Sequence, residues 1–446
     1  MIEDETKPYI DILARDPANF DALTGLGTLL STRGYPRAAR TAFAEAVSRH
    51  PGVAAGHANL ANALLDNDQV VAARTHYETA LRLAPDNIQA HQGLAVLLLR
   101  LGEEEAAQRH ARIGFEKLTA WPYRGDRPAV PMLLVLSALG GNLNTARFWD
   151  DRIFQKWTLV AEFCTPDLQL PTDGVVFNGI GDADRCARGL SAAEIALSRS
   201  MVPVINRPAA VLATKRVTNA HRLGKLDGVL TARTESMPRT LLCGPDGPAA
   251  LAENGFTFPL LLRSPGFQTG QHFVMVEHAG DLADAAARLP GTELLVMEFV
   301  DVRSADGKVR KYRVMIVDGR LYPLHLAISR EWMVHYFTAE MHDPEHRAEE
   351  AIFLENMTGV LGPQSVASLE SIKDTLGLDY GGIDFGLDAA GRVVVFEANA
   401  TMVVLHPPAG VEWAPKRAAV ERIEDAVRTM LLERASASQA IGARGA

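Results

Sequence analysis

The sequence is poor in cysteine: its 446 residues include three, Cys164, Cys186 and Cys243. They form no CxxC pair and no spacing typical of a metal site, which argues against a disulfide scaffold and against a zinc domain. We therefore expect reduced thiols in a cytoplasmic protein. We also expect no signal peptide, since the acidic N-terminus lacks an apolar segment. No apolar run is long enough to span a bilayer, so we expect no membrane partner.

An excess of basic residues is missing as well. The formal net charge is −9 at pH 7, whereas a nucleic-acid-binding protein usually presents a basic face, so we expect no nucleic-acid partner. The hydrophobic share of 47% and the charged share of 22% are typical of a soluble globular protein. A chain of this length usually folds into two or three domains.

A repeat with a period of 34 residues runs from residue 20 to about residue 119. Small residues such as Gly27 let paired helices approach closely, and large residues fill the space between them. The pattern of alanine, aromatic residue, alanine and proline recurs without a gap, at Ala39, Phe43, Ala46 and Pro51 and then at Ala73, Tyr77, Ala80 and Pro85. The period resembles that of tetratricopeptide repeats and predicts an all-α solenoid of three units, 20–53, 54–87 and 88–119.

Repeats of this kind usually form interaction surfaces, so the resemblance implies a peptide or protein partner on residues 1–119. Three units could instead serve to cap or dimerise the protein, because a fold does not fix a function. The histidines of this region, His57, His76 and His91, share no spacing with a carboxylate or a cysteine. We expect them on helix surfaces.

Prolines at positions 122, 128 and 131 end the helical pattern. Residues 120–205 are expected to form a small α/β domain. Its predicted elements are buried strands at 132–137 and 174–177, a helix at about 191–200 and a short strand at 202–205.

Two carboxylates and an amide are spaced to converge late in the chain. Residues 381–402 read as two strands joined by a glycine-containing turn, with Asp384 on the first strand and Glu397 and Asn399 on the second. Because side chains alternate along a strand, Glu397 and Asn399 share a face, and hairpin pairing can bring Asp384 to it. Three oxygen ligands on one face suit Mg²⁺ when phosphates and water complete its coordination.

A second pattern places a basic side chain beside a glycine loop. An apolar strand ends in Arg263, the loop after it contains Gly266, Thr269 and Gly270, and a second strand follows. A basic side chain beside a flexible loop suits the covering of a phosphate group. Further strands are predicted at 294–300 and on both sides of an Asp318–Gly319 turn.

In their order along the chain, these residues resemble the ATP-grasp fold of D-alanine–D-alanine ligases and glutathione synthetases. The resemblance implies an α/β fold after the repeats, in which a pre-ATP-grasp domain (120–205) precedes an ATP-grasp domain (206–435). A helix is expected at about 415–434, and residues 436–446 are expected to be a disordered tail. The matching positions are Lys215 or Arg216, Arg263, the hinge Glu298–Phe299–Val300, Arg313, Asp384, and Glu397 with Asn399.

The resemblance also implies a role for each position. Glu298 and the backbone of Phe299 and Val300 would hold adenine, with Asp301 near the ribose. The phosphates of ATP would be held by Lys215, Arg216 and Arg263 with the loop residues Gly266, Thr269 and Gly270. Asp384, Glu397 and Asn399 would bind two Mg²⁺ ions, and Arg313 and Arg263 would face the transferred phosphoryl group.

Two departures from the family pattern concern the substrate. Arg263 stands where the family usually has lysine, and a planar guanidinium holds phosphate in a different geometry. A segment containing His406 replaces the NxxPG that often follows the metal asparagine, so we expect an unfamiliar acceptor pocket. His325, His335 and His406 are candidate substrate contacts, as phosphate ligands or bases, and packing of a strand–helix junction is the alternative for them.

The function that the resemblance implies is an ADP-forming ligase, which joins a carboxylate to an amine through an acylphosphate, with an amino acid or peptide as substrate. A kinase of the same fold that phosphorylates a small molecule is one alternative. A scaffold whose repeats dock a partner, and whose ATP-grasp domain is weakly active, is another.

Overall fold

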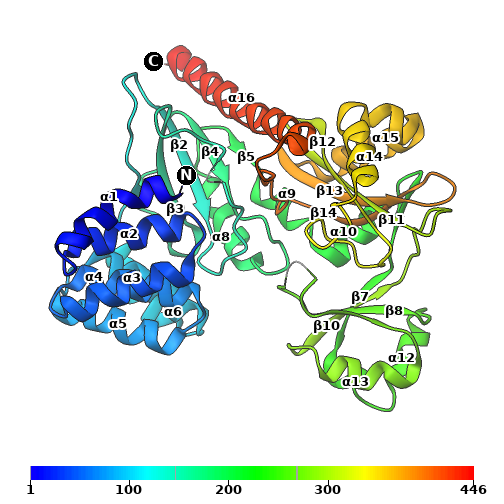
Figure 1. Cartoon of the computed structure of the whole chain (residues 1–446), viewed down its shortest axis with the longest axis horizontal. Helices are drawn as coiled ribbons and strands as arrows, with labels where there is room; N and C mark the ends of the chain where they lie inside the picture. The colour runs from blue at the N-terminus through cyan, green and yellow to red at the C-terminus, as the bar shows by residue number, and fades with distance from the viewer. Residues whose placement is uncertain (1, 146, 268–269, 446) are drawn as a thin grey trace. The chain divides into compact units, whose positions relative to one another are not determined.

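A computed structural model describes residues 2–145, 147–267 and 270–445 (Figure 1). Contacts divide the chain into two compact units: residues 1–119 with 163–169, and residues 120–162 with 170–446. Each unit is described by itself. Thr269, which we predicted in the phosphate-binding loop, lies outside the described residues. No helix of the described ranges is both long and apolar enough to cross a membrane.

The first unit is helical, as the 34-residue period predicts. Helices α2 and α3, α4 and α5, and α6 and α7 form successive pairs. Small residues face large ones: a Cβ atom added to Gly27 would lie 2.6 Å from the Phe43 ring, and Gly93 lies against the fully buried Tyr77 in the same way. The helices are α1 (Ile2–Arg15), α2 (Phe20–Thr32), α3 (Pro36–Arg49), α4 (Ala54–Asp66), α5 (Val70–Leu83), α6 (Ile88–Arg100) and α7 (Glu104–Gly114).

Histidines lie between the helices of two of these pairs, so the expectation that they lie on helix surfaces is wrong for His57 and His91, whereas His76 is half-buried. His57 and His91 are buried. The Nδ1 atom of His57 lies 2.9 Å from Nδ1 of His76, and the Nδ1 atoms of His91 and His110 are also 2.9 Å apart. The Nε2 atom of His57 lies 3.1 Å from the Pro51 carbonyl oxygen, which can only accept. A neutral His57 therefore carries its proton on Nε2 and accepts from Nδ1–H of His76.

The second unit begins with a parallel sheet. Strands β3 (Phe154–Val160), β2 (Val130–Leu136), β4 (Val175–Asn178) and β5 (Val204–Ile205) pair in that order, and all are parallel. The two-residue strand β1 (Thr119–Ala120) precedes them in the chain, and α8 (Ala187–Leu197) connects β4 to β5. Three of the strands lie within two residues of their predicted positions. Strand β3 was not predicted, because Gln155 and Lys156 interrupt its apolar pattern.

Two antiparallel sheets follow. The four-stranded sheet has the order β7 (Thr234–Pro238), β10 (Glu293–Glu298), β8 (Leu260–Arg263), β9 (Phe273–Val276). The five-stranded sheet has the order β12 (Arg320–Ser329), β11 (Val309–Val317), β13 (Tyr380–Leu387), β14 (Val393–Asn399), β6 (Val229–Thr231), and β6 alone runs parallel to its neighbour. The predicted turn between β11 and β12 has positive φ at both Asp318 and Gly319, as a two-residue hairpin favours.

Helices accompany both antiparallel sheets. The four-stranded sheet packs on its helices in a separate core that contains Leu251, Leu262 and Val296. The remaining helices of the second unit are α9 (Pro208–Leu212), α10 (Arg216–Leu223), α11 (Arg239–Leu242), α12 (Gly247–Glu253), α13 (Leu282–Ala287), α14 (Pro344–Glu355), α15 (Met357–Leu376) and α16 (Ala414–Gly445).

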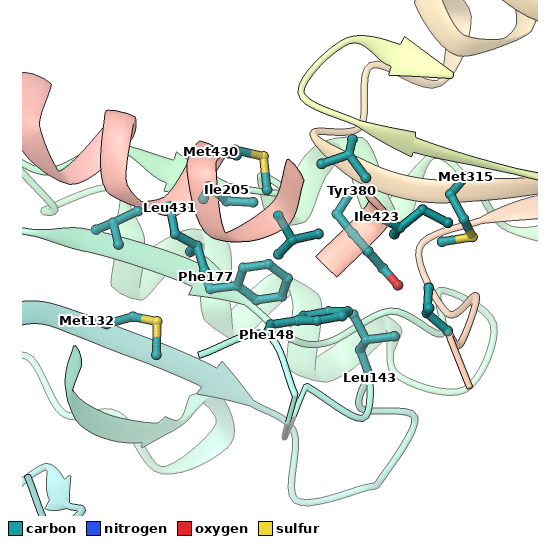
Figure 2. Packing of buried hydrophobic residues seen from close by; sticks show 14 of the residues in the cluster. Met132, Leu143, Phe148, Phe177, Ile205, Met315, Tyr380, Ile423, Met430 and Leu431 are labelled. Atoms are coloured by element: carbon teal, nitrogen blue, oxygen red, sulfur yellow. The ribbon is translucent and has the colours of Figure 1, made fainter. Parts of the chain in front are cut away.

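One core joins the parallel sheet, the five-stranded sheet and α16 (Figure 2). Phe177 and Ile205 of the parallel sheet meet Tyr380 of β13 and Ile423 and Leu431 of α16. Segments on both sides of residue 205, where we placed a domain boundary, therefore contribute to the same buried cluster.

Helix α16 extends beyond the end that we predicted near residue 434. It includes residues 436–445, which we expected to be a disordered tail. Ala435 belongs to the shared core and is 2% exposed. Alanine has the highest helix propensity, and the burial of Ala435 anchors this part of the helix to the core.

The paired histidines predict that acid destabilises the repeats. Burial and the neighbouring His57 lower the pKa of His76. Burial, His91 and Arg109 lower the pKa of His110, and Glu78 partly offsets that decrease. The unfolded chain therefore binds more protons than the folded chain below the ordinary histidine pKa of about 6.5. We expect the thermal unfolding midpoint, followed by circular dichroism, to fall between pH 7.5 and 5.5. The double variant His76→Gln/His110→Gln should lose part of that fall, and an identical fall would contradict the assignment.

Candidate functional site

Four chemically active side chains form one row across the five-stranded sheet. In the strand registers, His325 on β12 faces Arg313 on β11, Arg313 faces Asp384 on β13, and Asp384 faces Glu397 on β14. The pairing of Asp384 with Glu397 is the one that the hairpin pattern predicted. Register shifts lie directly beside the row, between Arg313 and Val314 and after Asp384. Such β-bulges re-aim neighbouring side chains and are common beside active sites.

Asp384 is the most deeply buried member of the row. It is fully buried and forms two hydrogen bonds with Arg313, Nε to Oδ1 at 2.5 Å and Nη2 to Oδ2 at 2.8 Å. The Lys311 ammonium lies 2.7 Å from Oδ2. Burial would raise the pKa of Asp384, but Arg313 and Lys311 outweigh burial and hold it well below its usual range. The carboxylate therefore stays ionised without contact with water.

Glu397 is also held ionised by a cation. Nη2 of Arg216 lies 2.5 Å from its Oε1. Burial would raise the pKa of Glu397, and Arg216 and Arg263 lower it instead. Asn399 donates from Nδ2 to Glu397 Oε1 at 2.9 Å, and its Oδ1 accepts from the amide and the hydroxyl of Thr401 at 2.9 and 2.8 Å.

Asp384, Glu397 and the cations paired with them line a cavity of about 360 Å³, whereas His325 and Asn399 do not appear in its wall. Its walls come from strands of both antiparallel sheets: Arg263 and Glu298 from the four-stranded sheet, and Lys311, Asp384 and Glu397 among those from the five-stranded sheet. Four cations, Arg216, Arg263, Lys311 and Arg313, share the interior with the carboxylates of Asp384 and Glu397. The hinge carboxylates Glu298 and Asp301 also line the wall, so the formal charges of the whole cavity balance. Around Asp384 and Glu397 the cations outnumber the carboxylates, which suits an anionic group there.

The predicted hinge forms another part of the wall. Glu298, Phe299, Val300 and Asp301 all line the cavity. Within the described residues, no hydrogen bond reaches the backbone groups of Phe299 or Val300. Trp332 lies edge-on to Phe299, with ring centroids 6.2 Å apart. This combination of free backbone groups and aromatic surface suits a planar, polar-edged ring.

The glycine loop meets a histidine. Gly270 lines the cavity with His335, and its backbone lies directly against Nε2 of that side chain. This buried Nε2 atom has no hydrogen-bond partner among the described residues. Burial and the nearby Lys311 lower the pKa of His335, so the ring is neutral at pH 7. Arg263 donates to the Phe267 carbonyl oxygen at 2.7 Å and has no carboxylate partner in the described ranges.

Other predicted site residues lie elsewhere. Lys215 and Gly266 do not appear in the cavity wall. His325 is buried, and the centroid of its ring lies 4.7 Å from the centroid of the Tyr336 ring. Burial, Arg313 and Lys416 lower the pKa of His325 well below its ordinary value. Nε2 of His406 pairs with Glu424 of α16 at 2.8 Å. These contacts favour packing roles for His325 and His406.

Two of the three predicted metal ligands have the donor chemistry that Mg²⁺ requires. The described residues contain no group of three or more His, Cys, Asp or Glu side chains placed to hold a metal ion. Asp384 and Glu397 nevertheless fit Mg²⁺, since both are ionised oxygen ligands on adjacent strands. Asn399 fits only if Thr401 releases its oxygen, because both lone pairs of that oxygen are occupied.

Sequence reasoning missed Lys311 and a buried charged cluster beside the row. Lys311 could have been found, because it stands two residues before Arg313 and shares its face of β11.

The buried charged cluster contains Lys416 of α16 and Glu350 of α14, with Nζ and Oε1 3.9 Å apart. The Tyr336 hydroxyl donates to Glu350 at 2.9 Å. Burial lowers the pKa of Lys416 to about 7 and raises that of Glu350. No sequence signal marked Lys416, because a lysine in an amphipathic helix usually faces water.

Comparisons with known proteins concern the first unit. A family model described as tetratricopeptide repeat matches residues 24–88 and 58–109. The N-terminal helix pairs are tetratricopeptide repeats. No curated protein matches the chain.

Similar solved structures include a crystal structure of MamA, at 22% identity over 25% of this chain and 65% of that chain, with a TM-score of 0.24. MamA from Desulfovibrio magneticus RS-1 matches at 21% identity over 26% of this chain and 64% of that chain, with a TM-score of 0.24. The pilF protein of Pseudomonas aeruginosa matches at 22% identity over 25% of this chain and 50% of that chain, with a TM-score of 0.23. This chain spans less than two thirds of each of these structures.

The ion pairs of the row predict a difference between two arginines of the cavity. Arg313→Met leaves the buried Asp384 with Lys311 as its remaining cation, and we expect the free energy of unfolding to fall by about 3 kcal/mol. Arg263→Met is the matched control, because Arg263 pairs with no described carboxylate, and it should cost less than about 1 kcal/mol. Urea denaturation measures both. Equal losses would show that the Arg313–Asp384 pair does not stabilise the sheet.

Proposed function

We propose that the second unit is an ATP-grasp enzyme that binds ATP with Mg²⁺ and ligates a carboxylate to an amine with release of ADP. The observation that carries this proposal is the cavity in which four cations face two ionised carboxylates. The excess of cations around Asp384 and Glu397 suits the triphosphate of ATP, since charge-assisted hydrogen bonds to phosphate are strong. When bound, Mg²⁺ would be held by Asp384 and Glu397 and would neutralise charge on the phosphates, and Asn399 would join them only if Thr401 released its oxygen.

The hinge supports a nucleotide in particular. The free backbone groups of Phe299 and Val300 can hydrogen-bond the edge of adenine, and Met297, Phe299 and Trp332 supply apolar surface for its faces. Asp301 would lie near the ribose. Arg216 and Arg263 would hold phosphates, and Gly270 allows the loop backbone to approach them closely.

The charges of the cavity favour a carboxylate as the group that attacks the γ-phosphorus. An ionised carboxylate oxygen needs no base; it forms a bond to phosphorus while the bond to the β,γ-bridging oxygen breaks and ADP leaves. Arg313 and Lys311 would stabilise charge on the phosphoryl oxygens. An amine then attacks the carbonyl carbon of the acylphosphate, inorganic phosphate leaves with the C–O electron pair, and the amine proton passes to phosphate or water. Exclusion of water by the closed cavity would protect this intermediate.

His335 supports a second candidate function, a kinase with a hydroxyl acceptor. A hydroxyl must lose its proton, and neither Asp384 nor Glu397 is available as a base because both are paired with cations. His335 is neutral, lines the cavity and has an unpartnered Nε2 atom within the described part of the chain. It is the one group that we would assign as general base in such a reaction.

The repeats add a proposal about the substrate. Tetratricopeptide repeats usually bind peptides or proteins, so the first unit would capture a peptide whose carboxylate the second unit activates. A scaffold role alone remains the rival function, and it is favoured by the internal pairing of Asp384 and Glu397 with arginines.

Binding of ATP tests the leading function directly. Calorimetry should show Mg²⁺-dependent binding of ATP to the full chain, and ADP and phosphate should appear when amino acids or peptides are added. Glu397→Gln removes a charged ligand and should abolish the Mg²⁺ dependence and at least about 99% of turnover. Glu331→Gln, an exposed position outside the cavity wall, is the control and should bind and react normally. Failure of the unaltered protein to bind ATP would refute the proposal.

His335→Gln separates the ligase from the kinase. If the acceptor is a carboxylate, turnover should fall by less than about tenfold, because no base is required, and free phosphate should be released. If the acceptor is a hydroxyl, loss of a general base should cost about 10²–10⁴ in rate, and the phosphate should stay on the product. Phosphorus NMR of the reaction mixture distinguishes the two products.

A further inference from the structure

The large cavity has an apolar wall that the proposed nucleotide does not use. Met402, Val403 and Leu405, which follow β14 in the chain, line it, and so does Phe337. Leu405 is 47% exposed and Phe337 is 80% exposed. Large apolar side chains that line a cavity and remain open to water indicate a surface that binds an apolar group.

Contacts hold this wall beside the row of charged side chains. A Cβ atom added to Gly382, two residues before Asp384 on β13, would lie 2.7 Å from the side chain of Met402. The Tyr380 hydroxyl donates to the Met402 carbonyl oxygen at 2.9 Å. The contact of His406 with α16 fixes the other end of the segment. The apolar wall is therefore preformed, and it begins next to the carboxylates of the row.

The ion pairs of the row decide which carboxylates can enter. A carboxylate that attacks the γ-phosphorus lies beside Lys311 and Arg313, since these cations face the phosphoryl group in the proposed reaction. In a free amino acid the ammonium group is attached to the next carbon atom, so it would lie beside the same two cations. Asp384 is already paired with both of them, and Glu397 is paired with Arg216. Neither carboxylate is available to an ammonium group, and both would be ligands when Mg²⁺ is bound.

The remaining carboxylates of the wall lie at the hinge. Among the described residues that line the cavity, these are Glu298 and Asp301. Glu298 accepts from the Arg233 amide at 3.3 Å, and Asp301 pairs with Arg303 at 3.0 Å. In the proposed function the hinge binds the nucleoside, which the triphosphate separates from the attacked phosphorus. An ammonium group beside the row would therefore lose its hydration without gaining a counter-ion, and this loss is unfavourable.

We propose that the carboxylate substrate is an apolar amino-acid residue whose nitrogen is acylated, as in an N-acylamino acid or at the C-terminus of a peptide. This inference rests on the proposed ligase function and narrows its substrate. The amide nitrogen carries no charge beside Lys311 and Arg313. The apolar side chain packs on the wall of Met402, Leu405 and Phe337. The carboxylate oxygen bonds to the γ-phosphorus and ADP leaves, as for any carboxylate in the proposed reaction.

Trapping of the acylphosphate with hydroxylamine tests the carboxylate substrate without knowledge of the natural amine. The hydroxylamine nitrogen attacks the carbonyl carbon, phosphate leaves with the C–O electron pair, and the nitrogen loses a proton to the buffer, which gives a hydroxamate. The full chain should be assayed with ATP, Mg²⁺ and one of five carboxylates: leucine, N-acetylleucine, N-acetylglycine, N-acetylaspartate or an acetylated tetrapeptide that ends in leucine. We expect N-acetylleucine to give hydroxamate at least about tenfold faster than leucine, N-acetylglycine or N-acetylaspartate.

The pattern across these carboxylates separates the possible results. A higher kcat/KM for the tetrapeptide than for N-acetylleucine identifies a peptide C-terminus as the source, and a lower one identifies a small N-acylamino acid. Leucine or N-acetylaspartate that reacts as fast as N-acetylleucine would overturn this inference and leave the ligase function standing. No hydroxamate from any of the carboxylates would refute the ligase function and this inference together.

Leu405→Ser shows whether the apolar wall contacts the substrate. It should raise the KM for N-acetylleucine by about tenfold and leave the KM values for ATP and N-acetylglycine unchanged. Val411→Ser, at an 88% exposed position that does not appear in the cavity wall, is the control and should leave all three KM values unchanged. A KM for N-acetylleucine that Leu405→Ser does not alter would overturn the assignment of this wall to the substrate.

Discussion

The burial of one carboxylate in the middle of a sheet constrains the rest of the second unit. Asp384 is fully buried, and an isolated carboxylate there would cost several kcal/mol in lost hydration. Arg313 and Lys311 offset this cost from the adjacent strand, so β11 and β13 must keep their register. The same register brings Glu397 beside Asp384, and Glu397 in turn fixes Arg216 at the start of α10. The charged wall of the large cavity follows from this chain of ion pairs.

The parts of the fold that depend on local patterns were predictable from the sequence. The 34-residue period predicted the repeats, because each helix pair packs large residues such as Phe43 and Tyr77 against small ones in the same way. Strand pairing near Asp384 was predictable since alternation and a glycine turn determine which residues of a hairpin share a face. The prediction that Arg313 and the hinge converge on one site rested on resemblance to a family and not on any local signal.

What could not be predicted depends on contacts between distant segments. Lys416 and Glu350 are 66 positions apart in the sequence numbering, and nothing near either residue indicates that both are buried. The histidine pairs of the repeats were misjudged for the same reason, since pairing across two helices removes His57 from the surface. The extension of α16 depends on Ala435 reaching a core built by two sheets. In each case tertiary packing decided between local alternatives of similar free energy.

The separate core of the four-stranded sheet has a mechanical consequence. Its apolar cluster around Leu262 is complete without side chains of the other sheets. Two short segments, 232–233 and 299–308, connect it to the five-stranded sheet. It can therefore pivot as a rigid body without breaking its own apolar cluster, and such a hinge would widen or narrow the space between the sheets. The stiffness of those two connections, more than the chemistry of the charged wall, would then set how quickly a ligand enters and leaves.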